Sequence, residues 1–125
     1  MPKVSRESAS QVRDFGVAED RSEEFDGYSV SFVSIRQTHD LAAMLKGLPD
    51  DSCQCPHWGY VFKGKLTWRF ADHQEVFEAG DAFYVPPGHV PEAEAGSEFI
   101  QFSPSEELRA TEAAMMENMK KMQAG

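Results

Sequence analysis

The sequence predicts an all-β fold with one C-terminal helix, and two observations carry this prediction. Between residues 28 and 102, short runs rich in β-branched and aromatic residues alternate with turns of Gly, Pro and Asp. After residue 103 the composition changes to helix-forming residues with apolar side chains at helical spacing. Strands this short and closely spaced are typical of a β-sandwich or barrel, because a parallel sheet needs helical crossovers between its strands.

Two of the expected strands follow a two-residue period. In the run YSVSFVSI (28–35), Tyr28, Val30 and Phe32 alternate with serines, as in a half-buried strand. The run KLTWRF places Leu66 and Trp68 on one face. Further strands are predicted in GYVFKG, EVFEA, AFYV and EFIQF, and LAAMLKG is expected to form a short helical turn capped by Asp40.

The chain of 125 residues is expected to form one domain with three parts. Residues 1–24 are predicted to be a polar N-terminal arm, either mobile or lying on a partner subunit, and residues 25–103 form the barrel. Residues 104–125 are predicted to be an amphipathic helix that starts at a capping box from Ser103 to Glu106, with Pro104 at its first position. Its apolar stripe is interpreted as a packing surface against the barrel or a second subunit, with a methionine-rich metal or peptide groove as the alternative: Leu108, Met115, Met119 and Met122.

Charge and hydropathy exclude several classes of partner. The formal net charge of −9 argues against nucleic acid and against an anionic membrane surface, since both need clustered Lys and Arg. No apolar run approaches the ~20 residues that span a bilayer, and the first residues lack the apolar centre of a signal peptide. We therefore expect a soluble, cytoplasmic protein.

Potential metal ligands are concentrated in the segment DSCQCPHWGYVFKG (51–64), which holds Cys53, Cys55 and His57 within five residues. Thiolates and imidazoles suit Zn²⁺ in tetrahedral coordination, with Fe²⁺ or Ni²⁺ as alternatives. In a straight strand the Cα atoms of Cys53 and His57 would lie ~13 Å apart, so metal binding needs a bend, which Pro56 favours. Two buried structural cysteines and a thiol redox pair are the alternative interpretations.

The segment GDAFYVPPGHVP (80–91) resembles the second motif of the cupin superfamily, with Gly80, Pro86 and Gly88 in register. Gly64 matches the glycine that ends the first cupin motif. This alignment places His57 at the position of the family's ligand Glu, with Cys53 and Asp51 at the two His positions. The resemblance covers residues 28–102 and implies a small single-domain cupin, a jelly-roll β-barrel or sandwich.

The match departs from the family at the metal ligands. Pro91 stands where the last ligand His is expected, and His89 lies two residues earlier, on the same face of an extended segment. The candidate metal ligands are therefore Cys53, Cys55, His57 and His89, with Asp51 as an alternative oxygen donor.

Three protein ligands with an open position would predict a metalloenzyme acting on a small molecule, whereas four would predict a structural or sensing site. A barrel that binds a small ligand without catalysis is the alternative, so the sequence leaves enzymatic activity open. The resemblance also implies a homodimer.

Overall fold

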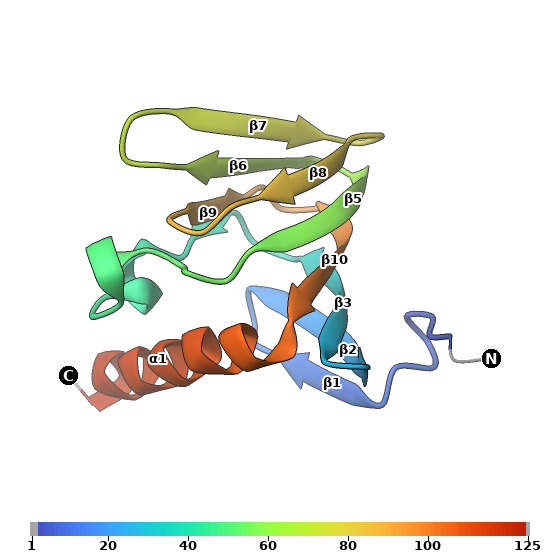
Figure 1. Ribbon diagram of the computed structural model, residues 1–125, viewed down its shortest axis with the longest axis horizontal. Coiled ribbons are helices and arrows are strands. Elements are labelled where there is room, and N and C mark those ends of the chain that lie inside the picture. Colours follow the sequence, from blue (N-terminus) through green and yellow to red (C-terminus); the bar gives the residue numbers. More distant parts are fainter. Residues whose placement is uncertain (1–2, 125) are drawn as a thin grey trace.

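Two antiparallel sheets and a C-terminal helix make up the computed structural model, which describes residues 3–124 (Figure 1). The larger sheet has the strand order β1-β2-β3-β10-β5-β8, and the smaller has the order β4-β9-β6-β7. The predicted all-β fold with a C-terminal helix is confirmed. The elements are β1 Gln11–Asp14, β2 Ala18–Phe25, β3 Tyr28–Ile35, β4 His39–Asp40, η1 Ala42–Leu45, η2 Pro49–Asp51, β5 His57–Lys63, β6 Lys65–Arg69, β7 Gln74–Glu78, β8 Ala82–Val85, β9 Val90–Ala93, β10 Glu98–Pro104 and α1 Ser105–Ala124.

The core lies between the two sheets and is built from inward-facing residues of strands in both of them. In β6 the predicted apolar face is confirmed, since Leu66 and Trp68 are only 2% and 3% exposed. In β3 the inward face carries Ser31, Val33 and Ile35, whereas Tyr28 is exposed on the other face. The remaining core side chains are Ala18, Val61, Phe83, Val85, Ala93 and Phe99.

The N-terminal segment differs from the polar arm predicted over residues 1–24. Residues 11–14 and 18–25 form β1 and β2, and β2 pairs with β3 along its whole length. The inward positions of β2 are Ala18, Asp20 and Ser22, of which Ala18 and Ser22 are buried. Because these side chains are small or polar, the strand has no hydrophobic period by which a sequence pattern could reveal it.

The C-terminal helix begins at Ser105, one residue after the predicted start. Pro104 is still part of β10, where it pairs with Tyr28, so the predicted capping box does not form. Instead, the Ser105 backbone N–H donates to the carbonyl of Gly27 at 2.8 Å. Within residues 3–124, no helix combines the length and the apolar character that crossing a lipid bilayer requires.

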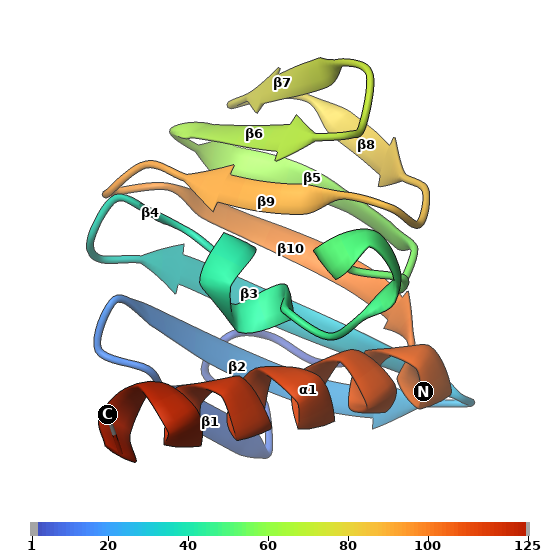
Figure 2. The same ribbon diagram turned by 90° about the vertical axis from the view of Figure 1, so that its left-hand side faces the viewer.

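Helix α1 lies across the open side of the two-sheet sandwich, with η1 and η2 between it and β9 (Figure 2). Leu108 and Met115 of the predicted stripe pack against a buried cluster formed by Leu45 of η1, Cys53 and Cys55. The Asn118 side-chain amide donates to the carbonyls of Met44 and Lys46 at 2.7 and 2.9 Å. The helix therefore forms a wall over the space between the sheets.

Candidate metal centre and ligand cavity

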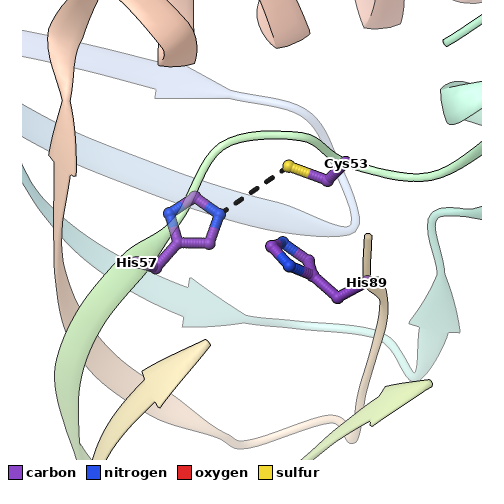
Figure 3. A group of neighbouring side chains, drawn as sticks. All are labelled: Cys53, His57 and His89. Atoms are coloured by element: carbon purple, nitrogen blue, oxygen red, sulfur yellow. Dashed lines mark hydrogen bonds between the residues drawn. The ribbon is translucent and has the colours of Figure 1, made fainter. Parts of the chain in front are cut away.

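Three of the four predicted metal ligands meet at one buried point, which we call the Cys–His cluster: Cys53, His57 and His89 (Figure 3). One ligand atom from each residue lies within 4.8 Å of the other two. Cys53 precedes β5, His57 is the first residue of β5, and His89 lies between β8 and β9. The cluster therefore joins two segments that are distant in the sequence.

Backbone pairing brings Cys53 and His89 together. They form an isolated antiparallel bridge, in which the Cys53 N–H donates to the His89 carbonyl and the Gly88 N–H donates to the Cys53 carbonyl, both at 2.8 Å. The chain then turns through residues 54–56 before β5 begins. As a result, the Cys53 Sγ lies 3.8 Å from the His57 Nε2, so the chain departs from a straight strand as metal binding requires.

Each imidazole of the cluster is held by a hydrogen bond at its outer nitrogen. The His89 Nδ1 lies 2.7 Å from the Pro86 carbonyl oxygen, which can only accept, so this nitrogen carries the proton and Nε2 carries a lone pair. Within residues 3–124 that buried Nε2 has no hydrogen-bond partner. The His57 Nδ1 is likewise 2.7 Å from the Ser103 hydroxyl, leaving Nε2 toward Cys53. Metal-binding histidines are typically oriented in this way.

Burial sets the protonation of the cluster. It lowers the pKa of His57 to about 3, with a smaller contribution from His89, and it also lowers the pKa of His89. Burial raises the pKa of the Cys53 thiol, against the opposing effect of hydrogen bonds with Cys55 and Thr111. At neutral pH the cluster therefore presents two uncharged imidazoles and one thiol. Only the thiol must lose a proton before all three can bind a cation.

Cys55 does not join this group, which departs from the predicted ligand set. Its Sγ lies 3.5 Å from the Pro56 carbonyl oxygen and 3.9 Å from that of Pro104. Burial raises the pKa of this thiol to about 12, which disfavours the thiolate that a metal would need. The reason is local geometry: residues 53–56 are not a regular strand, so residues two apart no longer share a face.

Asp51, the alternative oxygen donor, also lies outside the group. It is exposed, and its Oδ1 accepts a hydrogen bond from the Gly47 N–H at 3.0 Å. Of the two residues left open by the sequence, His89 is thus the one that lies beside Cys53 and His57.

A cavity of about 460 Å³ adjoins the Cys–His cluster and extends between the sheets beneath α1. Trp68, which also lines it, packs edge-on against His89 with ring centroids 5.1 Å apart, and its ring lies 6.0 Å from that of His57. The other walls are mostly apolar. They are formed by strand residues and by residues of the apolar stripe of α1, among them Val33, Leu66, Phe99, Leu108, Met115 and Met119. The volume falls in the range of small-molecule sites.

All the buried side-chain nitrogen and oxygen atoms that lack a hydrogen-bond partner within residues 3–124 belong to residues lining this cavity. They are Arg13 Nε, Asp20 Oδ1, Ser31 Oγ, Trp68 Nε1 and His89 Nε2. Sequence reasoning missed the first three because they lie in a segment without a hydrophobic period or on the serine face of β3. It also missed Thr111, which belongs to no recognisable motif, and it assigned Ser103 to a helix cap, whereas both side chains contact the cluster.

No protein-family model matches the chain, and no curated protein matches it in sequence. Solved structures do match. An RmlC-like cupin from Shewanella frigidimarina NCIMB 400 is 19% identical with a TM-score of 0.51, over 75% of this chain and 83% of that one. The chain has the cupin fold. The resemblance predicted from its two motifs is thereby confirmed at the level of fold.

Two further solved structures match a larger share of this chain. The polyketide cyclase RemF from Streptomyces resistomycificus is 14% identical with a TM-score of 0.60, over 84% of this chain and 80% of that one. A protein of unknown function from Rhizobium leguminosarum bv. viciae 3841 is 16% identical with a TM-score of 0.60, over 82% and 94%. Identities this low concern the fold alone.

Proposed function

We propose that this small cupin binds one divalent cation, Zn²⁺, through Cys53 Sγ, His57 Nε2 and His89 Nε2. The observation that carries the proposal is the His89 Nε2, a buried lone-pair nitrogen with no hydrogen-bond partner within residues 3–124. The neighbouring thiol and imidazole complete a donor set of one sulfur and two nitrogens, which suits Zn²⁺ and, less well, Fe²⁺ or Ni²⁺.

We further propose that the protein is a metalloenzyme acting on a small, largely apolar molecule in the adjoining cavity. Three protein ligands leave a coordination position open, and the cluster lines the cavity wall. A bound cation would supply Lewis-acid chemistry, polarising an oxygen of the molecule or of water. The chain's own residues support this role: Pro86 and Ser103 orient the imidazoles, Trp68 packs against both rings, and side chains of α1 line the cavity.

Elemental analysis of the purified protein tests the metal site. We expect about one zinc per chain in the wild type and none in Cys53→Ser or His89→Gln. Cys55→Ser is the matched control, because it removes a buried thiol of the same segment that lies outside the cluster, and it should keep its zinc. Absence of metal from the wild type after loading with zinc, iron or nickel would contradict the proposal, as would equal loss from Cys55→Ser.

A second candidate is a barrel that binds a small ligand without catalysis. The cavity favours it, because most of its wall is formed by residues outside the Cys–His cluster. The two functions differ in their dependence on metal: a binding barrel should retain its ligand when chelation removes the cation, whereas turnover by the enzyme should stop.

A further inference from the structure

A second polar site lines the same cavity and is formed by three charged residues, which we call the charged cluster: Arg13, Asp20 and Glu112. Arg13 of β1 is the cross-strand neighbour of Asp20 of β2. The Arg13 Nη2 lies 2.7 Å from the Glu112 Oε2 and 3.7 Å from the Asp20 Oδ2. Three elements of the fold, β1, β2 and α1, therefore meet at this point.

The pairing within the charged cluster is incomplete. Arg13 Nε and Asp20 Oδ1 are buried and have no hydrogen-bond partner within residues 3–124. Ser31 of β3, which is 1% exposed, also lines the cavity and has an unpartnered hydroxyl. Since buried polar atoms without partners destabilise a protein, three such atoms on residues that line one cavity indicate that a ligand supplies the missing hydrogen bonds.

The charges decide which polar group fits. One guanidinium faces two carboxylates, so the cluster has no spare positive charge for a carboxylate or phosphate. The unpartnered Arg13 N–H can only donate, whereas the unpartnered Asp20 oxygen accepts when ionised. A hydroxyl accepts from the first and donates to the second. An ammonium group only donates, so it would leave the arginine N–H unmatched.

The charged cluster and the Cys–His cluster meet the same turn of α1. Glu112 contacts Arg13, and the preceding residue, Thr111, has its Oγ1 3.8 Å from the Cys53 Sγ. Both clusters line one cavity whose other walls are mostly apolar. A single small molecule can therefore contact both.

We propose that Arg13, Asp20 and Ser31 bind a hydroxyl group of a neutral, largely apolar molecule, an alcohol or phenol, whose body fills the cavity toward the Cys–His cluster. This inference specifies the class of molecule that the proposed enzyme would act on, and it rests on the proposed function for the role of the metal. Binding of the hydroxyl group itself needs no metal.

Three probes with the same ring system test this inference: 2-naphthol, naphthalene and 2-naphthoate, titrated against the metal-loaded full chain at pH 7.5. We expect 2-naphthol to bind at least tenfold more tightly than either of the others. Asp20→Ala and Ser31→Ala should each reduce the preference for 2-naphthol over naphthalene at least threefold. Ser34→Ala, on the opposite face of β3, is the matched control and should leave the preference unchanged.

The ratio of the affinities for 2-naphthol and naphthalene distinguishes recognition of the hydroxyl group from a structural role of these residues. A substitution that only disturbed the structure would weaken the binding of both probes alike. Ser31→Ala keeps the test decisive if Asp20→Ala fails to fold, because the Ser31 hydroxyl makes no hydrogen bond within residues 3–124. Equal affinity for 2-naphthoate, or a preference unchanged in both variants, would overturn the inference. Repeating the titrations on chelated protein distinguishes the two proposals: failure of the metal proposal would leave the preference for 2-naphthol intact.

Discussion

The cavity has two polar sites, and they differ in the kind of atom that is left unpartnered. In the Cys–His cluster both imidazoles are uncharged and hydrogen-bonded at Nδ1, so the centre is faced by the Nε2 atoms, of which that of His89 carries a lone pair, and by a thiol. In the charged cluster the unpartnered atoms are a donor and an acceptor, on residues where one guanidinium faces two carboxylates. The first arrangement suits a cation, and the second suits a neutral hydroxyl. The pattern of unmatched atoms, more than the number of polar residues, thus indicates what each site binds.

The largest expected effect is the loss of a ligand at the Cys–His cluster. Replacing His89 by Gln removes the unpartnered Nε2, so we expect Zn²⁺ affinity to fall by at least about a thousandfold, measured by competition with a chelator. Asp20→Ala, at the charged cluster, should leave that affinity within a factor of about three. Equal losses in both variants would break the distinction between the two sites.

The charged cluster, unlike the Cys–His cluster, holds a carboxyl whose titration should make the free energy of unfolding fall as pH rises. Burial raises the pKa of Asp20 to about 6, against the attraction of Arg13 and with repulsion from Glu112. Because the pKa of Asp20 is higher in the folded protein than in the unfolded chain, the protonated carboxyl favours the folded state. This stabilisation is fully present below the unfolded pKa and is lost as pH rises through about 6.

Relative to Asp20→Asn, the metal-free wild type should therefore gain roughly 2–3 kcal/mol of unfolding free energy between pH 7.5 and 4. Urea unfolding of both proteins across this range measures the difference. A constant difference between wild type and variant would show that Asp20 titrates normally in the folded protein.

A smaller effect is expected from the partner of a metal ligand. Ser103→Ala removes the hydroxyl that orients His57, and losses of this kind typically reduce metal affinity by roughly 10- to 100-fold. Ser105→Ala, two residues further on, is the control, since its hydroxyl bonds to Ser29 instead. An unchanged affinity in Ser103→Ala would mean that packing against Trp68 alone positions the His57 ring.

The smallest expected signal is the release of protons when zinc binds. Because burial raises the pKa of Cys53 and lowers those of both histidines, only the thiol should lose a proton, on the order of one per zinc at pH 7.5. Calorimetry in two buffers with different ionisation enthalpies measures this number. Release of two protons that falls to one in Cys55→Ser would bring Cys55 back as a ligand, whereas a second proton that persists in this variant would come from zinc-bound water.

Sequence reasoning reached the Cys–His cluster and failed at the charged cluster for physical reasons. Gly80, Pro86 and Gly88 form a local pattern that specifies a bend, so the motif located His89 in the fold. Cys55 was assigned to the site because a bend at Pro56 was expected to bring both thiols and His57 together; residues 54–56 are irregular, and this irregular path leaves the Cys55 side chain outside the cluster.

Arg13 and Asp20 had no comparable signal. They lie on β1 and β2, where the inward-facing residues are small or polar and the pattern is that of a solvated segment. Their partner Glu112 comes from α1, so only the tertiary fold brings the three together. The homodimer and the cytoplasmic location stay predictions; light scattering at twice the chain mass of 14.0 kDa would support the first.

The position of Trp68 has a practical consequence for spectroscopy. The chain has two tryptophans; Trp68 is 3% exposed and lies against His57 and His89, whereas Trp58 is 43% exposed on the outer surface. A buried indole emits at shorter wavelength than a hydrated one, so the two emissions can be separated. In a Trp58→Phe variant, the remaining fluorescence would report directly, and without any added label, on what occupies the interior.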